Sequence, residues 1–185
     1  MRKLPPREER KDLTDFAHGR PASILECGQC ALLVRAEEQN DAIGRYVDDQ
    51  YDAGVMEHLF PRYVEAFRGK EKPYRSLLDD GADVLEIGSH LGAFLKVAGE
   101  WGWKPVGIDV GQDTANFARS KDLVTYRGTL QDCSFPSAHF DAIFVWNCFE
   151  QIDEPHVLLT EIRRVLKPGG LLLLRTPNAL FYRIC

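Results

Sequence analysis

Apolar residues in the second half of the chain fall into short runs, and helical patterns separate these runs. Each run is almost continuously apolar, which is typical of strands that are covered on both faces. Strands are expected at residues 83–87, 105–109, 124–128, 140–146 and 171–177. Strands that alternate with helices predict an α/β fold with a doubly wound, mainly parallel sheet and helices on both of its faces.

The intervening segments have helical spacing. Phe94 and Trp101 lie on one face of the helix expected after the first strand, and residues 113–120 form a short helix. Residues 156–166 are amphipathic, with apolar positions three and four residues apart. The sequence Lys-Pro-Gly-Gly at 167–170 is expected to stop that helix in a turn.

The N-terminal part differs and suggests three regions. Residues 1–35 form a segment with a Cys-x-x-Cys, and residues 36–75 form an N-terminal helical extension that acts as a lid or cap. Leu59 and Tyr63 mark the repeating apolar positions of that extension. Residues 76–185 form the core.

Composition narrows the choice of partners. The chain is 44% hydrophobic and 28% charged, which supplies enough apolar material for a core. A net charge of −5 without a basic stripe indicates no nucleic-acid partner. No apolar run reaches membrane-helix length and the N-terminus lacks a signal-peptide pattern, so we expect a cytoplasmic protein with no membrane association. Five cysteines, an odd number, predict no disulfide framework.

The sequence VLEIGSHLG, residues 84–92, carries the candidate chemistry. Gly88 and Gly92 follow a buried strand, where glycine allows a sharp turn and close approach to a ligand. The helix after this loop offers N–H groups to an anion such as a carboxylate. The dinucleotide fingerprint G-x-G-x-x-G is not met, because His90 stands at its second glycine and would crowd a pyrophosphate.

Two acids complete the pattern. Glu86 would repel a pyrophosphate but would suit a ligand that carries positive charge. Asp109 ends the second strand about twenty residues later, where an acid accepts hydrogen bonds from ribose hydroxyls. A nucleoside that carries both a cation and a carboxylate describes S-adenosylmethionine.

These motifs together resemble those of a known family. Residues 83–178 resemble the class I S-adenosylmethionine-dependent methyltransferases, and most closely the small-molecule branch that includes ubiquinone-biosynthesis and sugar methyltransferases. The motifs that carry the resemblance follow one another in order: VLEIGSHLGAFL, VGIDVG, GTLQDCSFPSAHFDAIFVWNCFEQIDEP and EIRRVLKPGGLLLLRTPN.

The resemblance implies a set of cofactor-binding residues. Some would line the methionine part, Asp109 would hold the ribose, Val110, Thr129 and Leu130 would border the adenine, and Tyr51 would lie over the cofactor. The full implied set is Tyr51, Glu86, Gly88, Ser89, His90, Gly92, Asp109, Val110, Thr129, Leu130, Trp146 and Asn147.

The sequence departs from the family pattern at three places. Thr129 stands where relatives have an acid, and Glu150-Gln151 stands where they have Glu-His. The chain also ends at Cys185, after the fifth of the family's seven strands, so it reads as truncated at the C-terminus. The fifth strand would then be an exposed apolar edge, which a homodimer or the N-terminal segment could cover.

Cys27 and Cys30 resemble the second half of a zinc ribbon found in some relatives. A structural zinc ion needs four ligands, and only His18 is available upstream. We therefore expect a degenerate ribbon with reduced cysteines and no metal.

The sequence thus predicts an S-adenosylmethionine-dependent methyltransferase that acts on a small molecule by in-line methyl transfer. No catalytic residue is assigned: the candidate bases are His90, His139, Glu150 and His156, and His90 is interpreted as a loop residue that shapes the pocket. The alternatives are a catalytically inactive module or fragment that binds S-adenosylmethionine, and a nicotinamide oxidoreductase.

Overall fold

The computed structural model describes residues 2–3, 23–26, 28–29, 33–36, 52–152 and 154–176. The chain divides into two compact units: residues 1–42 with 177–185, and residues 43–176. In the first unit three short strands form an antiparallel sheet in the order β1-β2-β3. These strands are β1 (Arg2–Lys3), β2 (Ser23–Glu26) and β3 (Leu33–Ala36).

Gly28 and Gln29 form a turn between β2 and β3. Cys27 and Cys30, which flank that turn, lie outside the described residues. The expectation of a metal-free pair therefore stays a prediction.

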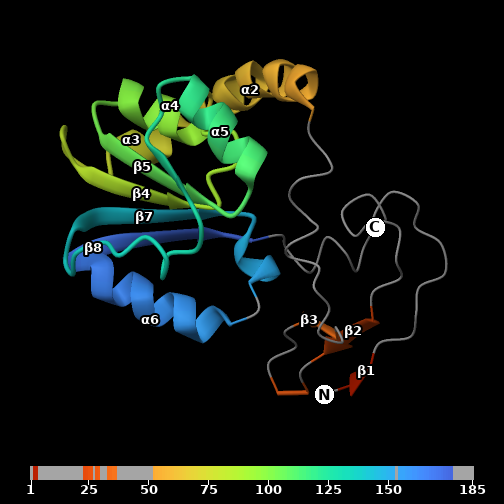
Figure 1. The fold of residues 1–185 in the computed structure, drawn as a ribbon. Helices are drawn as coiled ribbons and strands as arrows, with labels where there is room; N and C mark the ends of the chain where they lie inside the picture. Colours follow the sequence, from red (N-terminus) through yellow and green to blue (C-terminus); the bar gives the residue numbers. More distant parts are fainter. Residues whose placement is uncertain are drawn as a thin grey trace. The chain divides into compact units, whose positions relative to one another are not determined.

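The second unit contains a parallel five-stranded sheet in the order β6-β5-β4-β7-β8 (Figure 1). Its strands are β4 (Asp83–Ile87), β5 (Lys104–Asp109), β6 (Thr125–Arg127), β7 (Phe140–Trp146) and β8 (Leu166–Arg175). Every strand pair in this sheet is parallel. The predicted doubly wound α/β fold is confirmed.

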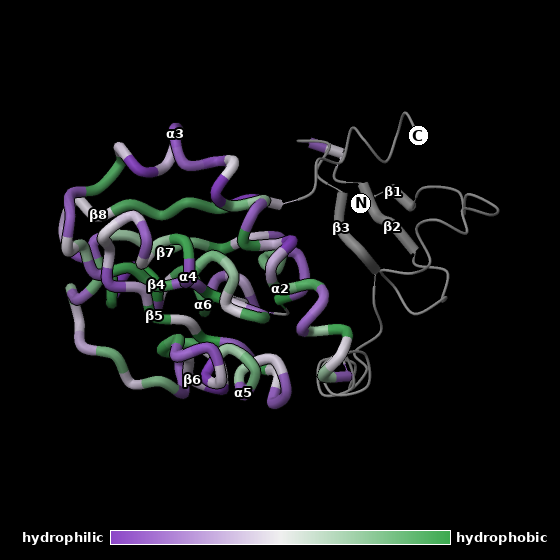
Figure 2. Tube along the Cα trace, turned by 90° about the horizontal axis from the view of Figure 1, so that it is seen from above, coloured by the Kyte–Doolittle hydropathy of each residue, from purple (hydrophilic) through white to green (hydrophobic). Residues whose placement is uncertain are grey.

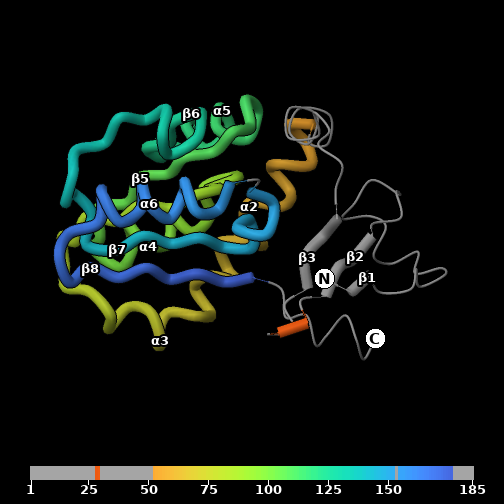
Figure 3. The backbone as a smooth tube through the Cα atoms, turned by 90° about the horizontal axis from the view of Figure 1, so that it is seen from below, coloured from red at the N-terminus to blue at the C-terminus, as the bar shows by residue number. Residues whose placement is uncertain are grey.

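Helices cover both faces of this sheet. Figure 1 shows α2, α4 and α5 on one side and α6 on the other, and Figure 3 shows α6 lying across the sheet from below. The helices are α2 (Ala53–Arg68), α3 (Glu71–Arg75), α4 (Ala93–Glu100), α5 (Gln112–Ser120) and α6 (Pro155–Val165), with a short 3-10 turn, η2 (Phe149–Gln151).

The apolar strands form two core layers. In β4, Val84 packs with α4 and Leu85 packs with α6, and neither side chain is exposed. In β7, Phe144 likewise packs on the α4 side of the sheet and Ile143 on the α6 side. Successive residues of a strand point to opposite faces, so a continuous apolar run fills both layers.

The predicted helix is present as α2, and its apolar residues are buried to different extents. Met56 and Val64 are the buried residues of this helix, whereas Tyr63 is 38% exposed and Leu59 packs only partly. Apolar residues lie along more than one side of α2, and packing against α4 and α5 determines which of them are buried. Asp52 caps the helix by accepting a hydrogen bond from the Val55 N–H at 2.8 Å.

The helix predicted before residues 167–170 does end there, at Val165, but the turn predicted at these residues is wrong. These residues belong to β8, which begins directly after α6 and pairs with β7 across a register shift between Phe140 and Ala142. Gly169 has a φ of +80°, which glycine adopts readily, so the strand continues through an irregularity. Figure 2 shows β8 as a hydrophobic segment, and Leu171, Leu172 and Leu174 are 37–39% exposed.

Candidate functional site

The predicted site residues meet where the strand order reverses. From β4 the sheet extends through β5 to β6 on one side and through β7 to β8 on the other. The loop at residues 88–92 follows β4 at that switch point. Doubly wound sheets bind ligands at the carboxyl ends of their strands at such a point.

The loop has a tight backbone that requires glycine. The N–H groups of Gly88 and Ser89 both donate to the Ile108 carbonyl at 2.9 Å. Gly88 has a φ of +71°, and a Cβ added there would lie 2.6 Å from Cys148 Sγ. Gly92 has a φ of +78°, and its Cβ would lie 2.6 Å from Leu123 Cδ1. The positive φ angle and the close neighbouring atom therefore both disfavour any residue other than glycine at these two positions.

Asp109 ties this loop to the second strand. Its carboxylate accepts hydrogen bonds from the His90 N–H at 2.7 Å, the Gly111 N–H at 2.8 Å and the Thr114 hydroxyl at 2.9 Å. A carboxylate has about four acceptor positions, so these three bonds leave about one for a ligand hydroxyl. Asp109 is thus both a structural acceptor and a candidate ribose ligand.

Glu86 is a buried acid at the end of β4. Its side chain is 3% exposed, and Oε2 has no hydrogen-bond partner. Burial raises the pKa of Glu86 well above its usual range, the charge of Asp109 raises it further, and Arg175 opposes both. A cationic ligand beside Glu86 would favour the ionised form and would supply the missing partner.

This pKa shift predicts a pH-dependent stability. Above the ordinary glutamate pKa of about 4.3 the unfolded chain releases the Glu86 proton, whereas the folded chain retains it up to the raised pKa. The free energy of unfolding of the unliganded protein therefore falls as pH rises through that window. Glu86→Gln should match the wild type near pH 4 and be more stable above it, measured by urea unfolding from pH 4 to 9.

Glu71→Gln provides the control, because Glu71 is an exposed acid in the first turn of α3. This substitution should leave the pH dependence as it is in the wild type. A constant difference between Glu86→Gln and wild type at every pH would contradict the assignment of a raised pKa.

His90 lies half-buried in the glycine loop, with a φ of +49°. Its ring centroid lies 6.0 Å from that of Tyr63 on α2. Burial lowers the pKa of His90, and the charge of Asp109 opposes that shift. These contacts agree with a residue that shapes the loop.

The expected adenine side contains an acid that the sequence analysis missed. The N–H and hydroxyl of Thr129 both donate to Asp132 Oδ2, at 2.8 and 2.7 Å, and these bonds lower the pKa of Asp132. A carboxylate therefore lies directly beside Thr129. Val110 is 40% exposed, whereas Leu130 is 1% exposed and packs in the core, so Leu130 offers almost no surface to a ligand.

At the expected methionine end, β7 ends with Trp146, and Asn147 follows with a φ of +53°. The Asn147 N–H donates to the Arg175 carbonyl at 2.8 Å. The Cys148 thiol lies under the loop and donates to the Ile87 carbonyl at 3.3 Å. Tyr51 lies outside the described residues.

Cys148 is not suited to act as a nucleophile. Burial raises its pKa to about 12, and the charges of Glu86, Glu150 and Asp109 add to that effect. The thiol therefore stays protonated at neutral pH, and thiolate chemistry is not available. Among the described residues no cluster of His, Cys, Asp or Glu could hold a metal ion.

A surface hollow of about 380 Å³ lies elsewhere, lined by Ser76 to Ala82 and Asp141. It is at the amino ends of β4 and β7, opposite the glycine loop, and it is not the candidate site. None of the described helices combines the length and the apolar character that a membrane span needs.

A glycine loop and a strand-end acid at the switch point of a parallel sheet are typical of α/β proteins that bind nucleosides. Residues 55–184 match the model of a family described as a methyltransferase domain. The chain therefore belongs to this methyltransferase family, as its resemblance to class I enzymes predicted.

Individual relatives agree with this assignment. A demethylmenaquinone methyltransferase of Tropheryma whipplei (strain Twist) is 32% identical over 114 residues, covering 56% of this chain and 48% of the relative. A fatty-acid O-methyltransferase of Mycolicibacterium smegmatis is 33% identical over 99 residues, covering 49% of this chain and 35% of the relative. The chain thus spans about half the length of the first relative and about a third of the second.

Solved structures show the same fold. A SAM-dependent methyltransferase from Aquifex aeolicus is 24% identical and superposes with a TM-score of 0.57. The alignment covers 68% of this chain and 72% of that structure.

Proposed function

We propose that this chain binds S-adenosylmethionine and takes part in the transfer of its methyl group to a small molecule. The observation that carries the proposal is the buried Glu86 carboxyl, whose Oε2 has no partner, beside a glycine loop that Asp109 holds in place. An acid in this position suits the positively charged amino acid part of the cofactor.

The residues present fit this cofactor. Gly88 and Gly92 keep side chains out of the loop, and no side chain caps the N-terminus of α4. The first N–H groups of α4 could therefore receive a carboxylate. Asp109 retains an acceptor position for a ribose hydroxyl, and Asp132 places a carboxylate on the expected adenine side.

The cofactor, when bound, supplies a methyl group on a sulfonium. The neutral thioether that remains after transfer is a good leaving group. This chain then has to bind and orient the two reactants and to exclude water from them. Alignment of two reactants lowers the barrier without a covalent protein intermediate. The protonated Cys148 takes no part as a nucleophile. We assign no catalytic base.

The methyl acceptor is proposed to be a small molecule with an apolar body. The names of the relatives support this, since one refers to demethylmenaquinone and another to a fatty acid. The expected methionine end also adjoins an aromatic cluster around Trp146. The expected cytoplasmic location, the absence of a nucleic-acid partner and a homodimer across β8 stay predictions.

Calorimetric titration with S-adenosylhomocysteine, S-adenosylmethionine and NADH tests the proposal. Both adenosyl compounds should bind with dissociation constants of roughly 1 µM to 1 mM, the range usual for enzyme substrates. Binding of NADH alone would support the oxidoreductase alternative instead.

Transfer of a labelled methyl group from S-adenosylmethionine then separates an enzyme from an inactive binding module. Quinol and fatty-acid acceptors are the first to try. Cofactor binding without transfer to any acceptor would support the module.

A further inference from the structure

Two basic residues border the aromatic cluster at the carboxyl ends of β7 and β8. Arg175, the last residue of β8, lies opposite Trp146 in the sheet register. Its guanidinium carbon is 5.0 Å from the Trp146 ring centroid, and its Nε donates to Asn147 Oδ1 at 3.0 Å. These two contacts hold the guanidinium in one orientation.

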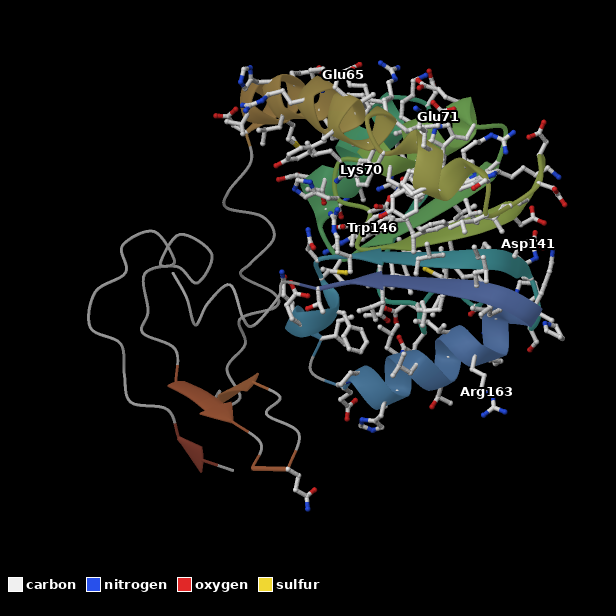
Figure 4. The ribbon with its side chains drawn as sticks, turned by 180° about the vertical axis from the view of Figure 1, so that it is seen from behind. Glu65, Lys70, Glu71, Asp141, Trp146 and Arg163 are labelled. Carbon is white, nitrogen blue, oxygen red and sulfur yellow. The ribbon has the colours of Figure 1, made fainter. Side chains whose placement is uncertain are left out.

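Lys70 reaches the same cluster from the segment that joins α2 to α3. Its Nζ lies 5.3 Å from the Phe67 ring centroid, and that centroid lies 6.0 Å from the Trp146 centroid. Tyr74 packs against Trp146 from α3, with centroids 5.4 Å apart. Figure 4 shows Lys70 and Trp146 at the same end of the sheet.

The positive charge of this pair is balanced by no ion pair within the described part of the chain, although the charge of Arg175 acts on the buried Glu86. Neither Lys70 nor Arg175 forms an ion pair there, whereas Arg68, Arg164 and Lys167 each do. Burial and the nearby charge of Arg175 lower the pKa of Lys70. An anion between the two cations would relieve their repulsion and would favour the charged form of Lys70.

We propose that Lys70 and Arg175 bind the acidic group of the methyl acceptor, whose apolar body packs against Trp146 and its aromatic neighbours. The acceptor is therefore an apolar acid. This inference rests on the proposed function, because it assigns the second substrate of the same site.

The position of the pair favours the acceptor over the carboxylate of the cofactor. The sheet order places β7 between β4, which leads into the glycine loop, and β8, which ends at Arg175. Neighbouring strands lie about 4.8 Å apart, so the backbone of Arg175 is about 10 Å from the strand that carries the loop, although its charge acts on Glu86 of that strand. The N-terminus of α4 is on the loop side and is the nearer anchor for the cofactor.

The test is calorimetric titration of 2-naphthoate and of its neutral amide into the full chain saturated with S-adenosylhomocysteine. The acid should bind and the amide should bind at least about tenfold more weakly, as expected for a charge-assisted hydrogen bond. Lys70→Gln and Arg175→Gln should each weaken the acid about tenfold, and Lys70→Arg should retain its affinity. Lys72→Gln, an exposed lysine on α3, is the control and should change nothing.

Two results would overturn the inference. In the first, the wild type binds the acid no better than the amide. In the second, Lys70→Gln weakens S-adenosylhomocysteine but not methylthioadenosine, which lacks the amino acid, so that the pair would hold the cofactor carboxylate. Failure of the proposed function is a separate result: the wild type would then bind no S-adenosylhomocysteine at all.

Discussion

Asp109→Ala is expected to abolish tight cofactor binding and to destabilise the fold. The substitution removes the acceptor of three hydrogen bonds, from His90, Gly111 and Thr114. A donor left without its partner costs about 1–3 kcal/mol, and water can replace part of this loss at a half-buried site. The free energy of unfolding should therefore fall by about 2–4 kcal/mol, measured by urea unfolding.

Affinity for S-adenosylhomocysteine should fall at least about tenfold in the same variant, because a hydrogen bond to a charged group contributes about 1.5–3 kcal/mol. Asp113→Ala is the matched control, since Asp113 is an exposed acid in the first turn of the adjoining helix. It should cost less than about 1 kcal/mol and leave the affinity unchanged. Equal affinities for Asp109→Ala and wild type would show that this acid does not hold the ribose.

Gly88→Ala is expected to be a strongly damaging single-methyl change in the loop. Gly88 has a φ of +71°, where a Cβ costs about 1–2 kcal/mol. The new Cβ would also lie 2.6 Å from Cys148 Sγ, and overpacking costs about 1–3 kcal/mol. The free energy of unfolding should therefore fall by about 2–5 kcal/mol, and cofactor affinity should fall with it.

Gly81 separates the two causes, because it has a φ of +80° but nothing within 4 Å of its Cβ position. Gly81→Ala should therefore cost only the backbone part, about 1–2 kcal/mol. Cys148→Ala in the Gly88→Ala background should recover about 1 kcal/mol, since it removes the sulfur atom from the contact. If Gly81→Ala proves as costly as Gly88→Ala, contact with Cys148 is not the cause.

Most of the fold could be predicted from local patterns. The strand at residues 83–87 agrees with the structure because its apolar run is short, is covered on both faces and ends at a glycine. The segment at 167–170 could not be predicted, because Pro and Gly usually mark a turn and only pairing with β7 draws them into a strand. The buried residues of α2 also depend on packing, because spacing alone does not select Met56 and Val64 over Tyr63.

The residues of the candidate site also divide into those that local patterns predict and those that depend on contacts in the folded chain. Glu86, Gly88 and Asp109 were identifiable because parallel strands end at one edge of the sheet. Asp132 and Arg175 were missed because their significance comes from contacts with Thr129 and Trp146, which spacing does not reveal. The available signals were an acid three residues after Thr129 and a charge directly after four leucines.

The central claim is that the loop after β4 and the acid at the end of β5 together receive S-adenosylmethionine. A crystal structure of the chain with S-adenosylhomocysteine tests it most directly. The account predicts the ribose hydroxyls against Asp109 and the amino group on the side of Glu86, with the homocysteine along residues 88–92. Density for the ligand at any other place, or none at saturating concentration, would contradict it.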